Sequence, residues 1–98
     1  MTYKDLIETI EIIRKYDTLP GCYTIWATYE EFGFEIQRDW NMSAKDIRRL
    51  AEMGWSLRSD DEYDENNKDF EKWENYKELS DEELVEIFKR FNSISIFV

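Results

Sequence analysis

The chain has 98 residues, a net charge of −10, and 42 % hydrophobic and 16 % aromatic residues. This length allows one domain, residues 1–98, and the aromatic content argues against global disorder. The negative charge disfavours direct contact with nucleic acid or anionic lipid, and favours basic proteins or cations as partners. No segment approaches the roughly 20 apolar residues that cross a bilayer, and no secretion signal is present, so we expect a cytoplasmic protein.

Residues 3–16 are expected to form a helix. Thr2 and Asp5 resemble a capping box at its start, and Arg14 and Lys15 lie in its last turn, where cations are favourable. Apolar side chains recur at helical spacing, which indicates a face packed on the core, with a partner-binding helix as the alternative. These side chains are Tyr3, Leu6, Ile7, Ile10 and Ile13.

A β-hairpin is expected next. Residues 22–28 are mostly β-branched or aromatic, and after Gly33 the residues Phe34 and Ile36 alternate with polar ones. Trp40 follows in a predicted loop. We expect it to cover the core, because large aromatic side chains usually bury most of their area, while an exposed contact is the alternative.

The second helix is expected to begin at Ser43 and to stop at Gly54, where a left-handed residue is favoured. A short strand over residues 55–58 follows. Ser80 and Glu83 form the capping box of a third main helix.

We expect Asn92 to end that helix, and the alternating residues 93–98 to form the last strand. The order of elements predicts an α+β fold: a small, mostly antiparallel sheet of three to four strands, covered on one face by about three helices.

An acidic insertion stands before the third main helix. Residues 60–83 contain 12 Asp and Glu against three Lys, a net charge of −9, whereas the rest of the chain has a net charge of −1. Such concentration costs self-repulsion and creates a field of one sign that can steer a basic partner. We therefore interpret residues 59–83 as the partner-binding segment. Residues 60–67 lack periodicity and are expected to form a loop, and residues 68–78 a helix with one aromatic edge.

Residue types that carry catalysis are scarce in this chain. It contains no His, Cys22 has no imidazole partner, and the three glycines are scattered rather than grouped in a phosphate-binding loop. Paired carboxylates say little in a chain with 23 of them. We therefore expect a binding protein, not an enzyme, with no cofactor and no dedicated metal site.

Calcium binding is an alternative function. Six residues fall in the register of an EF-hand loop, in which oxygen ligands hold a hard cation. Glu62 is long for the third position, and Glu65 replaces the glycine that makes the sharp turn. The six residues are Asp60, Glu62, Asp64, Asn66, Lys68 and Glu71.

Electrostatic mimicry of nucleic acid is the leading interpretation of the acidic segment. Duplex DNA carries one charge per about 1.7 Å of axis, and an acidic helix rising about 1.5 Å per residue approaches part of that density. Charge would steer the partner and aromatic anchors would hold it. The alternative is a solvated acidic face with its aromatic side chains in the core. The predicted contact residues are Asp60, Asp61, Glu62, Asp64, Glu65, Asp69, Glu71 and Glu74, with Trp73 and Tyr76 as anchors.

Three segments resemble parts of small phage and prophage proteins: residues 1–7, the stretch from Met42 to the Gly54-Trp55 pair, and the Ser-Ile-Phe-Val ending. The resemblance implies that the Gly-Trp turn and the closing strand lie close together, with the acidic segment and third helix inserted between them. The overall style also resembles phage-encoded anti-CRISPR proteins, several of which are acidic and occupy DNA-binding surfaces of Cas effectors.

The sequence and the resemblance together predict a stoichiometric inhibitor of a nucleic-acid-binding host defence protein, with a Cas effector as the leading target. It would act by occlusion in the host cytoplasm. Three alternatives remain open: an immunity-type inhibitor of a toxic nuclease, a calcium-responsive protein, and a structural protein of the virion.

Overall fold

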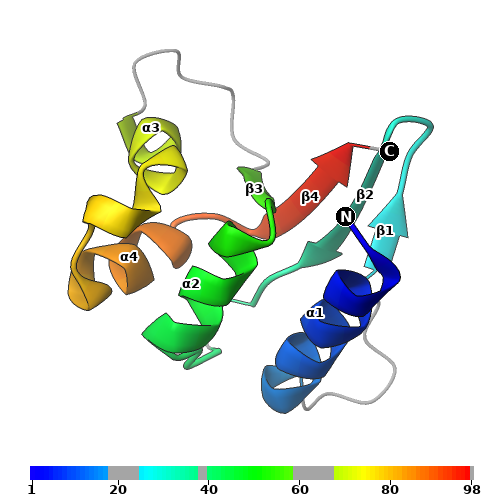
Figure 1. Ribbon diagram of the computed structural model, residues 1–98, viewed down its shortest axis with the longest axis horizontal. Coiled ribbons are helices and arrows are strands. Elements are labelled where there is room, and N and C mark those ends of the chain that lie inside the picture. The colour runs from blue at the N-terminus through cyan, green and yellow to red at the C-terminus, as the bar shows by residue number, and fades with distance from the viewer. Residues whose placement is uncertain (18–24, 38–39, 59–67, 98) are drawn as a thin grey trace.

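A computed structural model describes residues 1–17, 25–37, 40–58 and 68–97. The described residues form an α+β fold, as predicted, with an antiparallel sheet of four strands (Figure 1). In chain order the elements are α1 (Tyr3–Tyr16), β1 (Ile25–Ala27), β2 (Glu31–Glu35), α2 (Ala44–Glu52), β3 (Ser56–Arg58), α3 (Lys68–Glu74), the 3₁₀ helix η1 (Tyr76–Glu78), α4 (Asp81–Phe88) and β4 (Ser93–Phe97).

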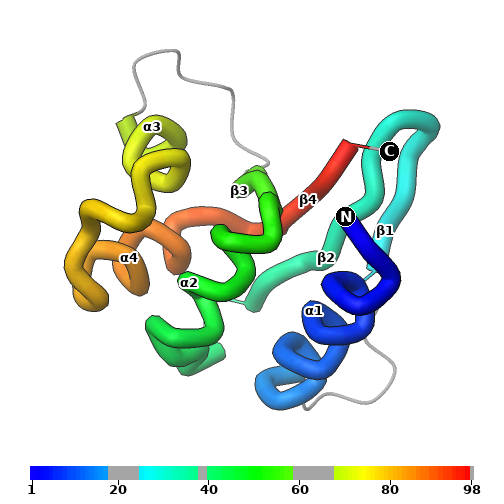
Figure 2. The backbone as a smooth tube through the Cα atoms, in the orientation of Figure 1, coloured from blue at the N-terminus to red at the C-terminus, as the bar shows by residue number. Residues whose placement is uncertain are grey.

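The sheet has the strand order β1-β2-β4-β3, so the last strand of the chain lies between β2 and β3 (Figure 2). β1 and β2 form the predicted hairpin. β3, which follows the Gly54-Trp55 turn, pairs with β4 through Leu57 and Ile94. The turn and the closing strand therefore lie together, as expected, and the chain from residue 59 to residue 92 is inserted between two paired strands.

Side-chain caps begin three of the helices at the predicted residues. The Thr2 hydroxyl accepts the backbone N–H of Asp5, and the Asp5 carboxylate accepts the N–H of Thr2, which is a complete capping box. Ser43 caps α2 and Ser80 caps α4 through one such bond each, because each serine hydroxyl accepts the backbone N–H of the residue three positions later, Asp46 or Glu83. Gly54, with φ of +96°, follows α2 in the left-handed region, as predicted. The Asn92 prediction is wrong, because α4 ends at Phe88 with Lys89 as its C-cap.

The core lies on one face of the sheet. Phe34, Leu57 and Ile94 point to this face and are buried, together with Trp55 and Leu50 of the α2 region. Trp40 is also buried, so it covers the core as expected. α4 packs against α2, and α3 packs against α4, which places α3 and α4 on the side of α2 away from α1 (Figure 1).

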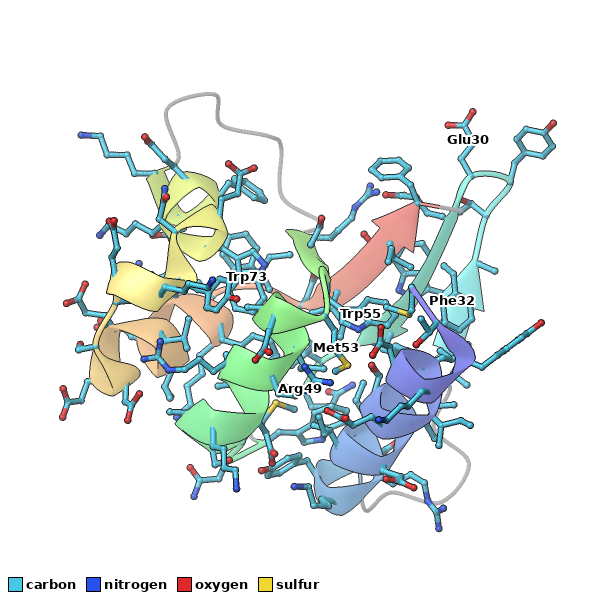
Figure 3. The ribbon with its side chains drawn as sticks, viewed as in Figure 1. Glu30, Phe32, Arg49, Met53, Trp55 and Trp73 are labelled. Atoms are coloured by element: carbon cyan, nitrogen blue, oxygen red, sulfur yellow. The ribbon has the colours of Figure 1, made fainter. Side chains whose placement is uncertain are left out.

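Polar contacts between α1 and α2 hold the first helix in place. Arg49 forms ion pairs with Glu8 and with Asp5 across the two helices (Figure 3). At the other end of α1, Tyr16 donates its hydroxyl to Asp46 at 2.5 Å and accepts the backbone N–H of Ser43.

The buried face of α1 differs from the predicted one. Tyr3, Ile7 and Ile10 were expected in the core, but their side chains are 89 %, 57 % and 36 % exposed. Thr9 is fully buried instead. Its hydroxyl accepts the indole N–H of Trp55 at 3.0 Å and donates to the carbonyl of Asp5, so no hydrogen-bonding group is stranded. The core side of the helix is Leu6, Thr9, Ile12, Ile13 and Tyr16.

Candidate acidic binding surface

The predicted partner-binding segment, residues 59–83, is described from residue 68 onward. This part forms α3, η1 and the start of α4. The expected helix over residues 68–78 is thus present as an α-helix followed by a 3₁₀ turn. Five of the predicted contact residues, and most of the EF-hand register, lie outside the described residues: Asp60, Asp61, Glu62, Asp64 and Glu65.

Aromatic side chains fix α3 to the rest of the fold. Trp73 is 5 % exposed and donates its indole N–H to the carbonyl of Trp55 at 2.7 Å. Its ring packs against Phe88 of α4, and Phe70 meets Phe91 edge to face, with ring centroids 5.0 Å apart. Figure 3 shows Trp73 in the interior between the helices. Buried aromatic contacts therefore hold α3 against α4 and the rest of the core.

Arg48 of α2 holds the turn between α3 and α4. Its guanidinium donates to the carbonyl of Tyr76 at 3.0 Å and to the carbonyl of Leu79 at 2.9 Å. It also forms an ion pair of 2.7 Å with Asp81 at the start of α4. One planar donor thus binds three acceptors from η1 through the first residue of α4, a geometry that suits arginine better than lysine.

Seven exposed carboxylates lie on α3, η1 and α4, and we call them the acidic surface. Residues 68–86 hold eight acids and three lysines, so this part of the chain has a net charge of −5. Three of the seven make side-chain contacts: Asp81 with Arg48, Glu83 with Ser80, and Glu86 with Arg90. The acidic surface consists of Glu71, Glu74, Glu78, Asp81, Glu82, Glu83 and Glu86.

Asp69, a predicted contact residue, has a structural role in the described fold. Its carboxylate accepts two hydrogen bonds from Arg90, at 3.0 and 3.1 Å, and its side chain is 16 % exposed. The hydrogen bond to Asp69 is the main cause that raises the pKa of Arg90. Asp69 joins α3 to the end of α4 and does not belong to the acidic surface.

The two predicted aromatic anchors are not exposed. Trp73 belongs to the core, the place that the alternative interpretation gave to the aromatic side chains, and Tyr76 is half-buried against the same core. Trp73 is therefore corrected from a contact residue to a core residue. Glu71 and Glu74, in contrast, are exposed as predicted.

The sheet face opposite the core carries a polar cluster that the sequence did not indicate. Trp26 lies over Gly33, where an added Cβ would stand 2.4 Å from the Trp26 ring, so only glycine fits under this indole. The Arg58 guanidinium lies 6.0 Å from the Trp26 ring centroid and pairs with Glu31, which is 9 % exposed. A cavity of ≈ 370 Å³ adjoins this cluster, lined by Trp26, Glu35, Ile36, Gln37, Arg58, Asn92 and Ser93.

Most of the residues that line this cavity have polar or charged side chains. The Asn92 side-chain oxygen is buried and has no hydrogen-bond partner among the described residues. Within the same residues, no group of three or more potential metal ligands is brought together, and no helix is long and apolar enough to span a membrane.

Comparisons with known proteins found no match: no family model, no curated protein and no solved structure matches the chain.

Proposed function

We propose that the chain is a stoichiometric inhibitor of a nucleic-acid-binding protein, and that it occupies the partner's nucleic-acid channel with the acidic surface. The leading target is a Cas effector of a CRISPR system in the host cytoplasm. A toxic nuclease neutralised by an immunity-type protein is the alternative target, because both enzymes bind nucleic acid through basic residues.

The observation that carries the proposal is the rigid display of exposed carboxylates. Glu71, Glu74, Glu78 and Glu82 have no ion pair or side-chain hydrogen bond among the described residues. Their backbone is held by buried Trp73 and by the hydrogen bonds from Arg48 to the carbonyls of Tyr76 and Leu79, which we call the Arg48 fork, so little conformational entropy is lost when a partner binds. A fixed, one-signed surface of this kind favours fast association with a basic groove.

Carboxylates that precede α3 in the sequence add to the negative charge of the acidic surface. Five further carboxylates, Asp60, Asp61, Glu62, Asp64 and Glu65, precede α3 in the sequence. Because the predicted anchor Trp73 is buried, the proposed contact is mainly ionic, and its affinity should fall steeply as salt rises.

The test measures DNA binding by purified Cas effectors and by nuclease toxins, with increasing amounts of the protein. We expect inhibition to saturate at one equivalent for the true target. The variant Glu71→Lys/Glu74→Lys/Glu78→Lys should weaken inhibition by about tenfold or more, because like charges then face the basic channel. None of the three side chains makes a contact that the fold requires.

A second triple variant controls for net charge. Glu30→Lys/Glu35→Lys/Glu52→Lys changes the net charge equally but alters exposed residues away from α3, with Glu30 at the hairpin tip (Figure 3). Of these three side chains, only Glu52 has an ion pair among the described residues, at 3.3 Å from Arg49 of the same helix. We expect it to inhibit nearly as well as the native protein. Equal inhibition by both triple variants, or no inhibition of any nucleic-acid-binding enzyme by the native protein, would refute the proposal.

A further inference from the structure

The exposed stripe of α1 is the second surface that requires an explanation. Tyr3, Ile7 and Ile10 are 89 %, 57 % and 36 % exposed, and Arg14 continues the stripe at the end of the helix. Near Tyr3 the stripe adjoins an apolar groove of ≈ 870 Å³, whose walls include Met1, Leu6, Phe32 and Phe97. Contiguous apolar surface on a small protein commonly marks an interaction site.

The spacing of the stripe is that of a coiled-coil seam. Tyr3, Ile7, Ile10 and Arg14 are separated by four, three and four residues, so Ile7 and Arg14 occupy a positions while Tyr3 and Ile10 occupy d positions. This spacing reads the same in both directions. When a second copy of the helix runs antiparallel, Ile7 of one copy therefore meets Ile10 of the other, and Tyr3 meets Arg14, a cation–π pair.

The charges that flank the stripe match the same arrangement. Lys4 and Glu11 occupy the e positions, on the side of the stripe away from the core, and both are exposed without an ion pair among the described residues. In an antiparallel pair, e positions face e positions, so Lys4 of each copy meets Glu11 of the other. A parallel pair would instead place Arg14 against Arg14. The pattern is therefore complementary to itself in one orientation.

The distribution of charge also allows two copies to approach at α1. Residues 3–16 contain three acids and three bases, a net charge of zero, although the whole chain has a net charge of −10. The acidic surface lies on α3, η1 and α4, on the far side of α2 from α1 (Figure 1). Contact through α1 thus keeps the two acidic surfaces apart.

We propose that the chain forms a two-fold symmetric dimer in which α1 packs antiparallel against α1 of a second copy. The dimer buries the Ile7 and Ile10 side chains of both copies and leaves two acidic surfaces pointing outward. This proposal is independent of the proposed inhibitory function, because neither the stripe nor its flanking charges belong to the acidic surface.

The first test is sedimentation equilibrium of the native protein and of two apolar-to-lysine variants. We expect a monomer–dimer equilibrium for the native chain. Ile7→Lys should raise the dimer dissociation constant by about tenfold or more, since symmetry places two lysines in the seam. Tyr29→Lys, which alters a 97 % exposed side chain in the hairpin turn, should leave the constant unchanged. A native protein that stays monomeric at all accessible concentrations would overturn the proposal.

The second test uses charge exchange to establish the orientation. Lys4→Glu and Glu11→Lys should each weaken the dimer, because each places like charges opposite one another in both symmetric pairs. The double variant Lys4→Glu/Glu11→Lys should recover the native constant at low salt. Additive weakening in the double variant would rule out the antiparallel seam. Circular dichroism of each variant verifies that α1 remains helical.

Discussion

Asp46 shows how a single side chain serves two elements. It lies in the first turn of α2, where a carboxylate favours the helix dipole, and it accepts hydrogen bonds from Lys15 at 2.6 Å and from Tyr16. Partial burial opposes its ionisation, but the hydrogen bonds from Lys15 and Tyr16 more than offset this effect and lower its pKa. The same contact with Asp46 raises the pKa of Lys15.

This pKa shift predicts an acid-dependent contribution to stability. A carboxyl whose pKa is lower in the folded state stabilises the fold above the unfolded-state pKa, and the contribution is lost as pH falls through the folded-state pKa. Asp46→Asn should therefore reduce the free energy of unfolding by about 1 kcal/mol at neutral pH, and by progressively less as the pH falls below the ordinary Asp pKa of 3.8. Urea denaturation of both proteins across this range measures the difference.

Glu30→Gln is the matched control, because Glu30 is exposed on the hairpin turn and has no ion pair among the described residues. Its unfolding free energy should follow the native value at every pH. If the deficit of Asp46→Asn stayed constant from neutral to acidic pH, the carboxylate would not be the origin of the stabilisation.

Thr9 marks the limit of prediction at the residue scale. The helix 3–16 and its cap follow from local sequence, and both are confirmed. Which face of the helix is buried does not follow from local sequence, because a threonine is an acceptable core residue only when its hydroxyl has hydrogen-bond partners. One of those partners, the indole N–H of Trp55, lies 46 residues away in the chain. Without that contact, periodicity alone assigned Tyr3, Ile7 and Ile10 to the core.

At the scale of elements, residues 55–97 also show which features local sequence predicts and which depend on contacts made only in the fold. Alternation predicted β3 and β4, and the capping box at Ser80 located α4, because these signals are local. The orientation of α3 was not predictable, because Trp73 suits a partner pocket and a core equally well by composition. Its burial depends on Phe88 and on the Trp55 carbonyl, which only the fold brings into contact with it.

The contacts of the Arg48 fork predict which part of the chain opens locally when they are lost. Arg48→Lys keeps the charge but loses the planar set of donors, so the carbonyls of Tyr76 and Leu79 lose their bonds. We expect faster amide hydrogen exchange over residues 76–84, by about tenfold, with a smaller change in the sheet. Arg49→Lys is the control, since Arg49 contacts Asp5, Glu8 and Glu52 and should affect only α1 and α2. An equal increase in the amide exchange rate across the whole chain of Arg48→Lys would show that the fork does not act locally.

For the whole molecule, the concentration of charge in one segment predicts a salt-dependent stability. Residues 60–83 have a net charge of −9 and the rest of the chain −1, so self-repulsion is strongest within the insertion. Raising the salt concentration from about 20 mM to about 200 mM shortens the Debye length to below about 10 Å and should raise the Tm of the native protein by a few degrees.

The two triple variants distinguish local repulsion from net charge. Each changes the net charge from −10 to −4, so a global effect would reduce the salt-induced rise in Tm equally in both. If repulsion is local, Glu71→Lys/Glu74→Lys/Glu78→Lys should lose most of the rise, because it relieves the crowding of carboxylates on α3 and η1, whereas Glu30→Lys/Glu35→Lys/Glu52→Lys should keep most of it. Thermal melts at the two salt concentrations measure both. Equal salt-induced rises in Tm in the two variants would mean that the clustering of charge has no effect on stability. In that case, neutralisation by a basic partner would relieve little repulsion and would add less to the free energy of binding.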